Sequence, residues 1–376
     1  MQLKIGIVGL PNVGKSTLFN ALTKKGVPME NYPFCTIDPS VGVVAVPDAR
    51  LDILAEFSKS DKKVPAVIEF VDIAGLVKGA SQGEGLGNKF LTHIREVDAI
   101  AEVVRIFSAQ GGPASGGEDI LHVMGDINPE RDIAVINLEL VLADLESVNK
   151  RLANVESDVK RGDKEAIVLK AHLESAKRIL EEGKLAGHDY SDLQLLTAKP
   201  ILYVFNRKAG LNQQNWSPDS AFLQSLGSYV YVDSKIEQEL SELEGEDKIA
   251  FRKELMGEES ANPTSPDGLR GASSDGINDL IKESYKMLGL MSYFTTGGPP
   301  AGGETRAWTI GVGSTAPEAG AAIHTDFLTK FIRAEVVAYD DLISAGSYAK
   351  AREQGKVRTE GKEYIVQDGD VIEFKI

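Results

Sequence analysis

Gly9-Leu-Pro-Asn-Val-Gly14-Lys15-Ser16 is the stretch of the sequence that decides the fold. It matches the pattern G-x-x-x-x-G-K-[ST], in which a glycine-rich loop wraps around phosphate groups with its backbone N–H groups pointing inward. The apolar run that precedes it, residues 3–8, predicts a buried strand, and residues 16–23 follow with helical spacing. Strand, loop and helix in this order are the context that the motif requires. The sequence therefore predicts an α/β fold of the P-loop NTPase type.

The loop also predicts which residues meet a nucleotide. Lys15 is expected to reach the β- and γ-phosphates, and the hydroxyl of Ser16 is expected to ligate Mg²⁺. A side-chain carbonyl at the position of Asn12 can ligate a monovalent cation beside the phosphates, so K⁺ is a candidate cofactor; the alternative is an asparagine that only orders the loop. The nucleotide-binding residues predicted in the loop are Asn12, Val13, Gly14, Lys15, Ser16 and Thr17.

A second group of residues is predicted on the phosphate side. Val71-Asp72-Ile-Ala-Gly75 places a carboxylate at a strand end, where Asp72 can hold Mg²⁺ and the N–H of Gly75 can meet the γ-phosphate. Thr36 lies where a first switch segment would supply a second hydroxyl to Mg²⁺. The alternative for Thr36 is a solvated loop threonine.

The remaining apolar pattern predicts how the chain is organised. Further strands of a mostly parallel sheet are expected at residues 41–46, 67–71, 100–107 and 200–205. Between residues 128 and 197 the strand signal disappears. Apolar residues recur there at alternating spacings of four and three, which is a heptad seam that Arg161-Gly162-Asp163 interrupts. The seam residues are Val141, Leu145, Val148, Leu152, Val155 and Val159 before the interruption and Ala166, Leu169, Leu173, Ala176 and Leu180 after it. This predicts an antiparallel helical hairpin inserted into the sheet domain; two ordinary surface helices are the alternative. Beyond Gly289, short alternating runs predict strands at residues 307–312, 331–337, 363–366 and 371–376, and a helical stretch is expected near 340–354, which together indicate a small α+β domain.

Composition sets limits on the class of protein. A chain of 376 residues is long enough for two or three domains, and its formal net charge of -15 repels polyphosphates and anionic membranes at long range. Its one cysteine, Cys35, cannot form an intrachain disulfide or a multi-thiolate zinc site. The N-terminus lacks signal-peptide features, and no apolar run reaches the roughly 20 residues of a membrane span. A cytoplasmic protein without a membrane partner is expected.

Six phrases of the sequence are long and specific: Gly9–Ser16, Asn31-Tyr-Pro-Phe-Cys-Thr-Ile37, Val71–Ser81 with Gly83–Asn88, Arg306-Ala-Trp-Thr-Ile310, His324-Thr-Asp-Phe327 and Phe331-Ile-Arg-Ala-Glu335. Through these phrases the sequence resembles a known family, the Obg-related P-loop proteins of the YchF group, also called Obg-like ATPases. The resemblance covers almost the entire chain and implies a GTPase-like domain at 1–127 and 198–290, an inserted hairpin at 128–197 and a ubiquitin-like TGS domain at 291–376.

The base-reading residues depart from the GTPase pattern. Ordinary GTPases read guanine with Asn-Lys-x-Asp at a strand end, but here the strand ends in Asn206-Arg207-Lys208-Ala209. Ala209 cannot accept the guanine hydrogen bonds, and unpaired guanine donors cost about 1–3 kcal/mol per desolvated group. ATP is therefore expected to bind better than GTP, as the resemblance also implies. Asn206 and Arg207, with Ser234 in the base-side loop, are the predicted base contacts; a strand-end cap is the alternative for Asn206.

The predicted catalytic groups are Lys15, Gly75 and His122. Leu76 occupies the position where many GTPases carry the glutamine that orients the attacking water, so turnover by the protein alone is expected to be slow. His122 can orient water by either ring nitrogen, and a surface histidine is the alternative reading.

Two classes of function follow. The first is a Mg²⁺-dependent ATPase that acts as a switch and is stimulated by K⁺ or by a partner; the second is a nucleotide-gated interaction factor with negligible hydrolysis. A GTPase is the runner-up activity. A metabolic kinase is a third class, but the sequence shows no evident domain for binding a phosphate acceptor. The family's links imply a ribosome or ribosomal RNA as partner, through the hairpin and the TGS domain; no DNA partner is expected. Segment Lys350–Glu363, with five basic and three acidic residues, is the candidate RNA contact, and a solvated face is its alternative.

Overall fold

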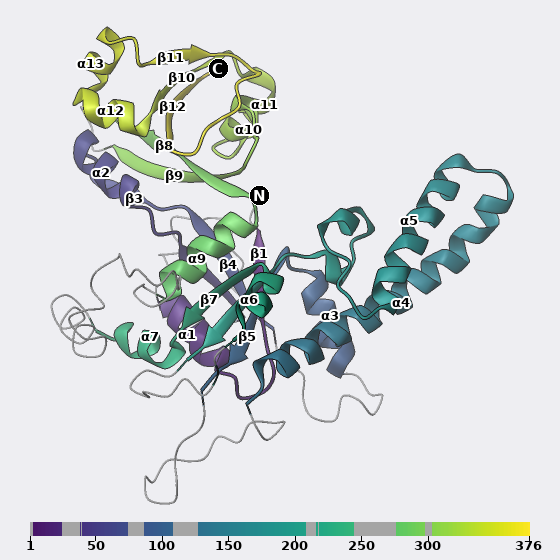
Figure 1. Cartoon of the computed structure of the whole chain (residues 1–376). Coiled ribbons are helices and arrows are strands. Elements are labelled where there is room, and N and C mark those ends of the chain that lie inside the picture. Colours follow the sequence, from purple (N-terminus) through teal and green to yellow (C-terminus); the bar gives the residue numbers. More distant parts are fainter. Residues whose placement is uncertain are drawn as a thin grey trace, which may run out of the picture.

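The part of the chain that the structure describes forms two six-stranded sheets and a long helical hairpin (Figure 1). The computed structural model describes residues 3–24, 38, 40–73, 86–107, 127–207, 216, 218–243, 276–297 and 303–376. Among these residues, no helix is both long enough and apolar enough to cross a lipid bilayer.

The first sheet has the strand order β2-β4-β1-β5-β6-β7. Only β2 runs antiparallel to its neighbour, and the other pairs are parallel, as the sequence predicts. Because the parallel strands all point one way, their carboxyl ends meet along one edge of the sheet. The strands are β1 (Lys4–Val8), β2 (Val41–Ala45), β4 (Val67–Asp72), β5 (Ala99–Arg105), β6 (Ile201–Asn206) and β7 (Ser228–Val232).

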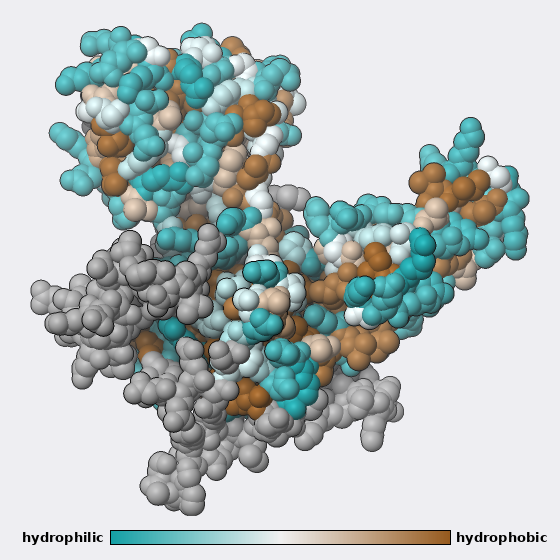
Figure 2. Space-filling view, viewed as in Figure 1, coloured by the Kyte–Doolittle hydropathy of each residue, from teal (hydrophilic) through white to brown (hydrophobic). Residues whose placement is uncertain are grey.

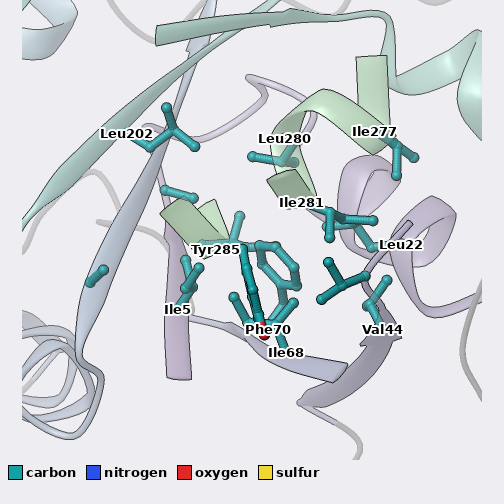
Figure 3. Close-up of a cluster of buried hydrophobic side chains, with 14 of the residues drawn as sticks. Ile5, Leu22, Val44, Ile68, Phe70, Leu202, Ile277, Leu280, Ile281 and Tyr285 are labelled. Atoms are coloured by element: carbon teal, nitrogen blue, oxygen red, sulfur yellow. The ribbon is translucent and has the colours of Figure 1, made fainter. Parts of the chain in front are cut away.

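Helices cover this sheet and close its core. Figure 3 shows Ile5 and Phe70 of the sheet facing Leu22 of α1 and Ile281 and Tyr285 of α9, all within one buried apolar cluster. β1 and β5 bury both of their faces, which is why they read as nearly unbroken apolar runs. The helices of this part are α1 (Lys15–Lys24), α3 (Leu86–Arg95), α6 (Ser220–Leu226), α7 (Ser234–Leu240) and α9 (Gly276–Met287).

The hairpin consists of α4 (Pro129–Lys160) and α5 (Lys164–Glu181), and it projects from the sheet as a long arm (Figure 1). The side chain of Asn128 caps α4 by accepting from the N–H of Arg131, and Asp163 caps α5. The predicted interruption at residues 161–163 is confirmed, since it separates the two helices. Two 3₁₀ turns, η3 (His188–Leu193) and η4 (Leu196–Ala198), lead the chain back to β6.

The seam between the two helices follows the heptad prediction with one error. Val148 and Leu173 are fully buried in the cluster that joins α4 to α5. Leu169 is predicted in the same seam, but its side chain is 36% exposed. The side chain of its neighbour Val168 is 70% exposed. Leu169 lies three residues after Ala166 and four before Leu173, which are both buried, so it shares their side of α5 and is still partly open to solvent.

The second sheet has the order β11-β10-β12-β8-β9-β3. The prediction of a strand at 363–366 is wrong: only Ile365 forms an isolated bridge there, to Thr315. Tyr364 and Val366 give the segment its alternating pattern because they pack into the second core without joining a ladder. The strands are β3 (Lys62–Val64), β8 (Leu290–Thr296), β9 (Glu304–Gly311), β10 (Arg333–Ala338), β11 (Arg358–Glu360) and β12 (Asp370–Lys375); the helices are α10 (Ala316–Ala321), α11 (Asp326–Lys330), α12 (Tyr339–Ala345) and α13 (Tyr348–Glu353).

One strand connects the two sheets. Helix α2 (Ala49–Ser58) and β3 lie between β2 and β4 in the chain, yet β3 pairs in parallel with β9 of the second sheet. Figure 1 shows α2 and β3 reaching up to the C-terminal part of the molecule. The N-terminal part of the chain thus supplies the last strand of the C-terminal sheet.

Candidate nucleotide site

The phosphate loop leaves β1 at Val8 and enters α1 at Lys15. Two of its residues have left-handed backbones, Asn12 with φ of 63° and Gly14 with φ of 97°. Asparagine tolerates this region better than most residues, and glycine adopts it without steric cost. The carbonyl of Gly14 accepts the N–H of Leu18 over 3.0 Å, which begins the helix. The sequence thus folds into the loop-to-helix turn that the motif predicts.

Two glycines of the loop are also required by close approach. A Cβ atom at position 9 would lie 2.6 Å from the backbone oxygen of Val103, and one at position 14 would lie 2.2 Å from Nδ2 of Asn206. Any larger residue would push the loop away from the ends of β5 and β6. The two glycines therefore keep the loop seated against these strand ends.

Lys15 and Asp72 meet at the carboxyl ends of β1 and β4, which are neighbours in the sheet. The distance between Lys15 Nζ and Asp72 Oδ1 is 3.6 Å, and the two side chains are 12% and 26% exposed. Asp72 Oδ1 is buried and accepts no hydrogen bond from the described residues. A desolvated carboxylate oxygen with spare acceptor capacity suits a hard divalent cation, and Ser16, exposed in the first turn of α1, lies next to Lys15 in the chain. The residues present thus fit Mg²⁺.

Asn206 connects the phosphate loop to the base-side loop. Its Nδ2 donates to the backbone oxygen of Val13 over 2.7 Å, and its Oδ1 accepts the N–H of Ser234 over 3.1 Å. Asn206 is only 3% exposed. The next residue, Arg207, donates its N–H to the oxygen of Val232 over 2.8 Å and so extends the ladder between β6 and β7. The structure brings the predicted residues Val13, Asn206 and Ser234 together.

Ser234 begins α7 directly after Asp233, which caps that helix. The residue is 1% exposed, and its Oγ is buried without a hydrogen-bond partner in the described part of the chain. A buried hydroxyl with unused capacity costs free energy unless a ligand or water satisfies it. This hydroxyl lies 3.9 Å from the position of a Cβ on Gly14, a position that Asn206 Nδ2 also approaches closely.

Several predicted site residues lie outside the described residues. Thr36, Gly75 and His122 belong to them, as do Leu76 and Ala209, on which the expectations of slow turnover and weak guanine binding depend.

The structure adds one residue that sequence reasoning missed. Arg105 is the last residue of β5, is 2% exposed, and donates from Nη1 to the backbone oxygen of Asn12 over 3.3 Å. Burial lowers the pKa of its guanidinium. The signal in the sequence was an arginine that directly follows the apolar pair Val103-Val104, since a buried strand does not end in a charge without a partner.

Comparison with known proteins agrees with this geometry. A family model described as "50S ribosome-binding GTPase" matches residues 4–169, and the C-terminal model for YchF-type GTPases, described as "Protein of unknown function (DUF933)", matches residues 290–376. The protein named Ribosome-binding ATPase YchF from Bacillus subtilis (strain 168) is 48% identical over 390 residues, which cover 100% of this chain and 99% of that protein. The chain belongs to the YchF family. The relative of the same name from Pasteurella multocida is 47% identical over 387 residues, covering 100% of this chain and 99% of that protein.

The fold of the YchF family is also found in a solved structure. The YchF GTPase of Schizosaccharomyces pombe aligns with a TM-score of 0.82 at 35% identity, over 100% of this chain and 98% of that one. The likeness therefore extends over both sheets and the hairpin. Together with the loop geometry, membership of the YchF family makes the first sheet a nucleotide-binding P-loop domain.

Proposed function

We propose that this protein is a Mg²⁺-dependent nucleotide switch that hydrolyses ATP in preference to GTP. The observation that carries the proposal is the buried Asp72 Oδ1, which accepts no hydrogen bond from the part of the chain that the structure describes and lies 3.6 Å from Lys15 Nζ at the mouth of the phosphate loop. Relatives that match over the full chain are named Ribosome-binding ATPase, which supports ATP as the substrate.

The phosphate side of the site is assigned as follows. Lys15 binds the β- and γ-phosphates, while the backbone N–H groups of Val13, Gly14 and Thr17 surround them. Ser16 and Asp72, with Thr36, hold Mg²⁺, which when bound neutralises charge that develops on the phosphates. The N–H of Gly75 binds the γ-phosphate.

The base side is assigned to Asn206, Arg207 and Ser234. The hydrogen bonds of Asn206 to both loops support a role in fixing their separation, and the unused hydroxyl of Ser234 supports a ligand contact. Ala209, in place of the aspartate of ordinary GTPases, leaves the N1 and N2 donors of guanine without an acceptor. ATP is therefore favoured; a GTPase is the second candidate.

Hydrolysis by the protein alone is slow in this proposal, because Leu76 cannot orient the attacking water. His122 is the internal group proposed to do so, and a partner that completes the site is the alternative. K⁺ held by Asn12 is a second proposed source of stimulation. If neither raises turnover, the protein is a nucleotide-gated interaction factor instead.

The proposed partner is the ribosome or its RNA, contacted by the hairpin and the C-terminal part. Exposed apolar side chains on the hairpin, among them Leu142 and Val168, support a contact surface there (Figure 2). The basic segment at 350–363 gives weaker support, because Arg352 pairs with Glu335, Lys356 with Asp341 and Arg358 with Glu360. Neither DNA nor a membrane is proposed as a partner, and the proposed compartment is the cytoplasm.

The same proposal divides the chain into a GTPase-like domain (1–127 and 198–290), the inserted hairpin (128–197) and a TGS domain (291–376). The separation of the two sheets and of the arm supports this division. The exception is β3, which comes from the first domain and completes the sheet of the last one.

Multiple-turnover release of phosphate from ATP, in K⁺ or Na⁺ and with or without ribosomes, tests the proposal. Faster turnover in K⁺, lost in Asn12→Ala, supports the cation site; equal rates in both salts refute it. Stimulation by ribosomes supports a switch, whereas tight ATP binding without turnover under all four conditions supports the interaction factor.

A further inference from the structure

Arg105 is a buried charged residue at the edge of the nucleotide site. Its Nη1 donates to the oxygen of Asn12 over 3.3 Å and its Nε donates to the oxygen of Phe107 over 3.0 Å. Its Cζ lies 4.5 Å from the centre of the Phe107 ring, which is a cation–π distance. These contacts hold the planar guanidinium between the phosphate loop and the end of β5.

Arg105 acts together with Asn206 of the neighbouring strand. The two residues are register partners on β5 and β6. Arg105 holds the carbonyl of Asn12, and Asn206 holds the carbonyl of Val13 over 2.7 Å. Two adjacent side chains at the sheet edge thus hold the carbonyls of two consecutive loop residues.

The geometry of the peptide unit determines where the N–H groups of the loop point. A trans peptide is planar, so its N–H points away from its C=O. A carbonyl of Asn12 that is held by Arg105 directs the N–H of Val13 to the opposite side, and the carbonyl held by Asn206 does the same for the N–H of Gly14. Positive φ angles at Asn12 and Gly14, 63° and 97°, flank these two peptide units. Consecutive N–H groups that converge on one side form a concave anion site.

We propose that Arg105 is a positioning residue for phosphate binding: it holds the Asn12 carbonyl so that the N–H of Val13 faces the phosphates of the nucleotide. This inference rests on the proposed nucleotide site and adds a residue to it. A guanidinium suits the task because it stays charged when buried and its fork of donors serves two carbonyls at fixed angles. A lysine can reach one carbonyl but cannot also stack as a plane on Phe107.

Arg105→Gln is the direct test, with calorimetric titration of MgADP and MgATP at a temperature where circular dichroism shows the variant folded. We expect both dissociation constants to rise about tenfold to a hundredfold, because a charge-assisted hydrogen bond that orients the loop is lost. Arg105→Lys should recover part of the affinity. Arg151→Gln is the matched control: Arg151 also donates from Nη1 to a backbone carbonyl, that of Leu193 over 2.7 Å, but on the hairpin. Its affinity for MgADP should equal that of the wild type.

Comparing MgATP with MgGTP distinguishes the effect of Arg105 from that of base preference. Arg105 acts on the phosphate side, so Arg105→Gln should weaken MgATP and MgGTP by the same factor, whichever base the wild type prefers. A folded Arg105→Gln protein with wild-type affinity for MgADP overturns the inference, and so does a loss confined to one base. If Arg105→Gln does not fold, Phe107→Leu decides, because it removes the ring and keeps the carbonyl: a several-fold weaker MgADP complex supports the role, and unchanged affinity overturns it.

Discussion

At the scale of single residues, the site depends on a cation and a carboxylate that meet where two neighbouring strands end. Lys15 and Asp72 are brought to 3.6 Å by the parallel pairing of β1 and β4 rather than by nearness in the chain. Neither side chain belongs to the apolar cluster beneath them. They are therefore expected to serve the ligand and to contribute little to the fold.

Lys15→Ala should weaken MgATP binding by about tenfold to a hundredfold, since a charge-assisted bond to phosphate contributes roughly 1.5–3 kcal/mol. The thermal midpoint of the nucleotide-free protein should remain within a few degrees of the wild type. Calorimetric titration and a melting curve measure the two quantities. Lys177→Ala, on the hairpin, is the control with unchanged affinity; an equally strong complex in Lys15→Ala would contradict the assignment of the loop.

The phosphate-loop residues could be predicted from the sequence because their spacing itself determines the geometry. Gly14 must accept a positive φ and leave room for Asn206, and both requirements are met only by glycine. Arg105 could not be assigned in the same way. Its contact with Asn12 spans 93 positions in the chain and depends on β1 and β5 being neighbours. Local pattern carries no information on such a pairing.

At the scale of elements, the place where α4 meets β5 is unusual because it buries two carboxylates. Glu102 of β5 is 1% exposed, and Asp132 of α4 is 3% exposed. Burial, together with the nearby Asp132, raises the pKa of Glu102 well above its usual value. Tyr203, the register partner of Glu102 on β6, has its pKa raised to about 12 by burial and by Glu102. These buried carboxyl groups at the base of the hairpin therefore lower the free energy of unfolding by an amount that depends on pH.

Glu102→Gln should stabilise the protein relative to wild type at neutral pH. When the pKa of a glutamate is higher in the folded than in the unfolded state, the free energy of unfolding falls as pH rises between the two pKa values. The fall begins near the unfolded pKa of about 4.3 and is about 1.4 kcal/mol per pH unit. The stability advantage of the variant should therefore be small near pH 4 and grow as pH rises.

Urea unfolding at a series of pH values measures this difference. Glu146→Gln, an exposed position on α4, is the control and should show no such slope. A difference between Glu102→Gln and wild type that is constant with pH would contradict the assignment.

Strand prediction succeeded where burial on both faces leaves an apolar run, as at β4 and β5. It failed for β3 and β11, each three residues long and rich in charge. Their pairing is fixed by partners distant in the chain, β9 and β10, so their own residues need no strong preference. The hairpin could be predicted because the residues of its seam lie close together in the sequence. The contact of Asp144 with the N–H groups of Leu196 and Thr197 could not, because it joins residues more than 50 positions apart.

At the scale of the whole molecule, the two sheets are joined by the segment between β2 and β4. Arg50 of α2 donates to Asp368 over 2.7 Å and to Asp48 over 2.8 Å, and it lies over the ring of Phe294. Near β3, Ser60 Oγ and Thr305 Oγ1 are 2.6 Å apart. A Cβ on Gly369 would lie 2.7 Å from Arg50 Nη1, so a glycine there leaves room for the contact. The segment that links two strands of the nucleotide sheet is thus held against the second sheet.

Arg50→Met should loosen this joint while keeping the apolar stem. The carboxyl of Asp368 is 53% exposed, so solvent screens the pair and the loss should be about 1 kcal/mol. Hydrogen exchange should quicken by about fivefold at the amides that pair β3 with β9. Arg333→Met, exposed on β10 of the same sheet, is the control. Exchange in Arg50→Met that equals the wild type would show that β3 is held by its ladder alone.

The affinity of the wild-type protein for MgATP against MgGTP, measured under one salt and one Mg²⁺ concentration, tests the central claim most directly. The site holds Asn206 between the phosphate loop and the base-side loop, but the chain supplies Ala209 where guanine needs an acceptor. We expect MgATP to bind more tightly, and we expect Ala209→Asp to improve MgGTP binding by up to the roughly 1–3 kcal/mol of a bidentate contact. A reproducible wild-type preference for MgGTP would contradict the account, because another residue would then read the base.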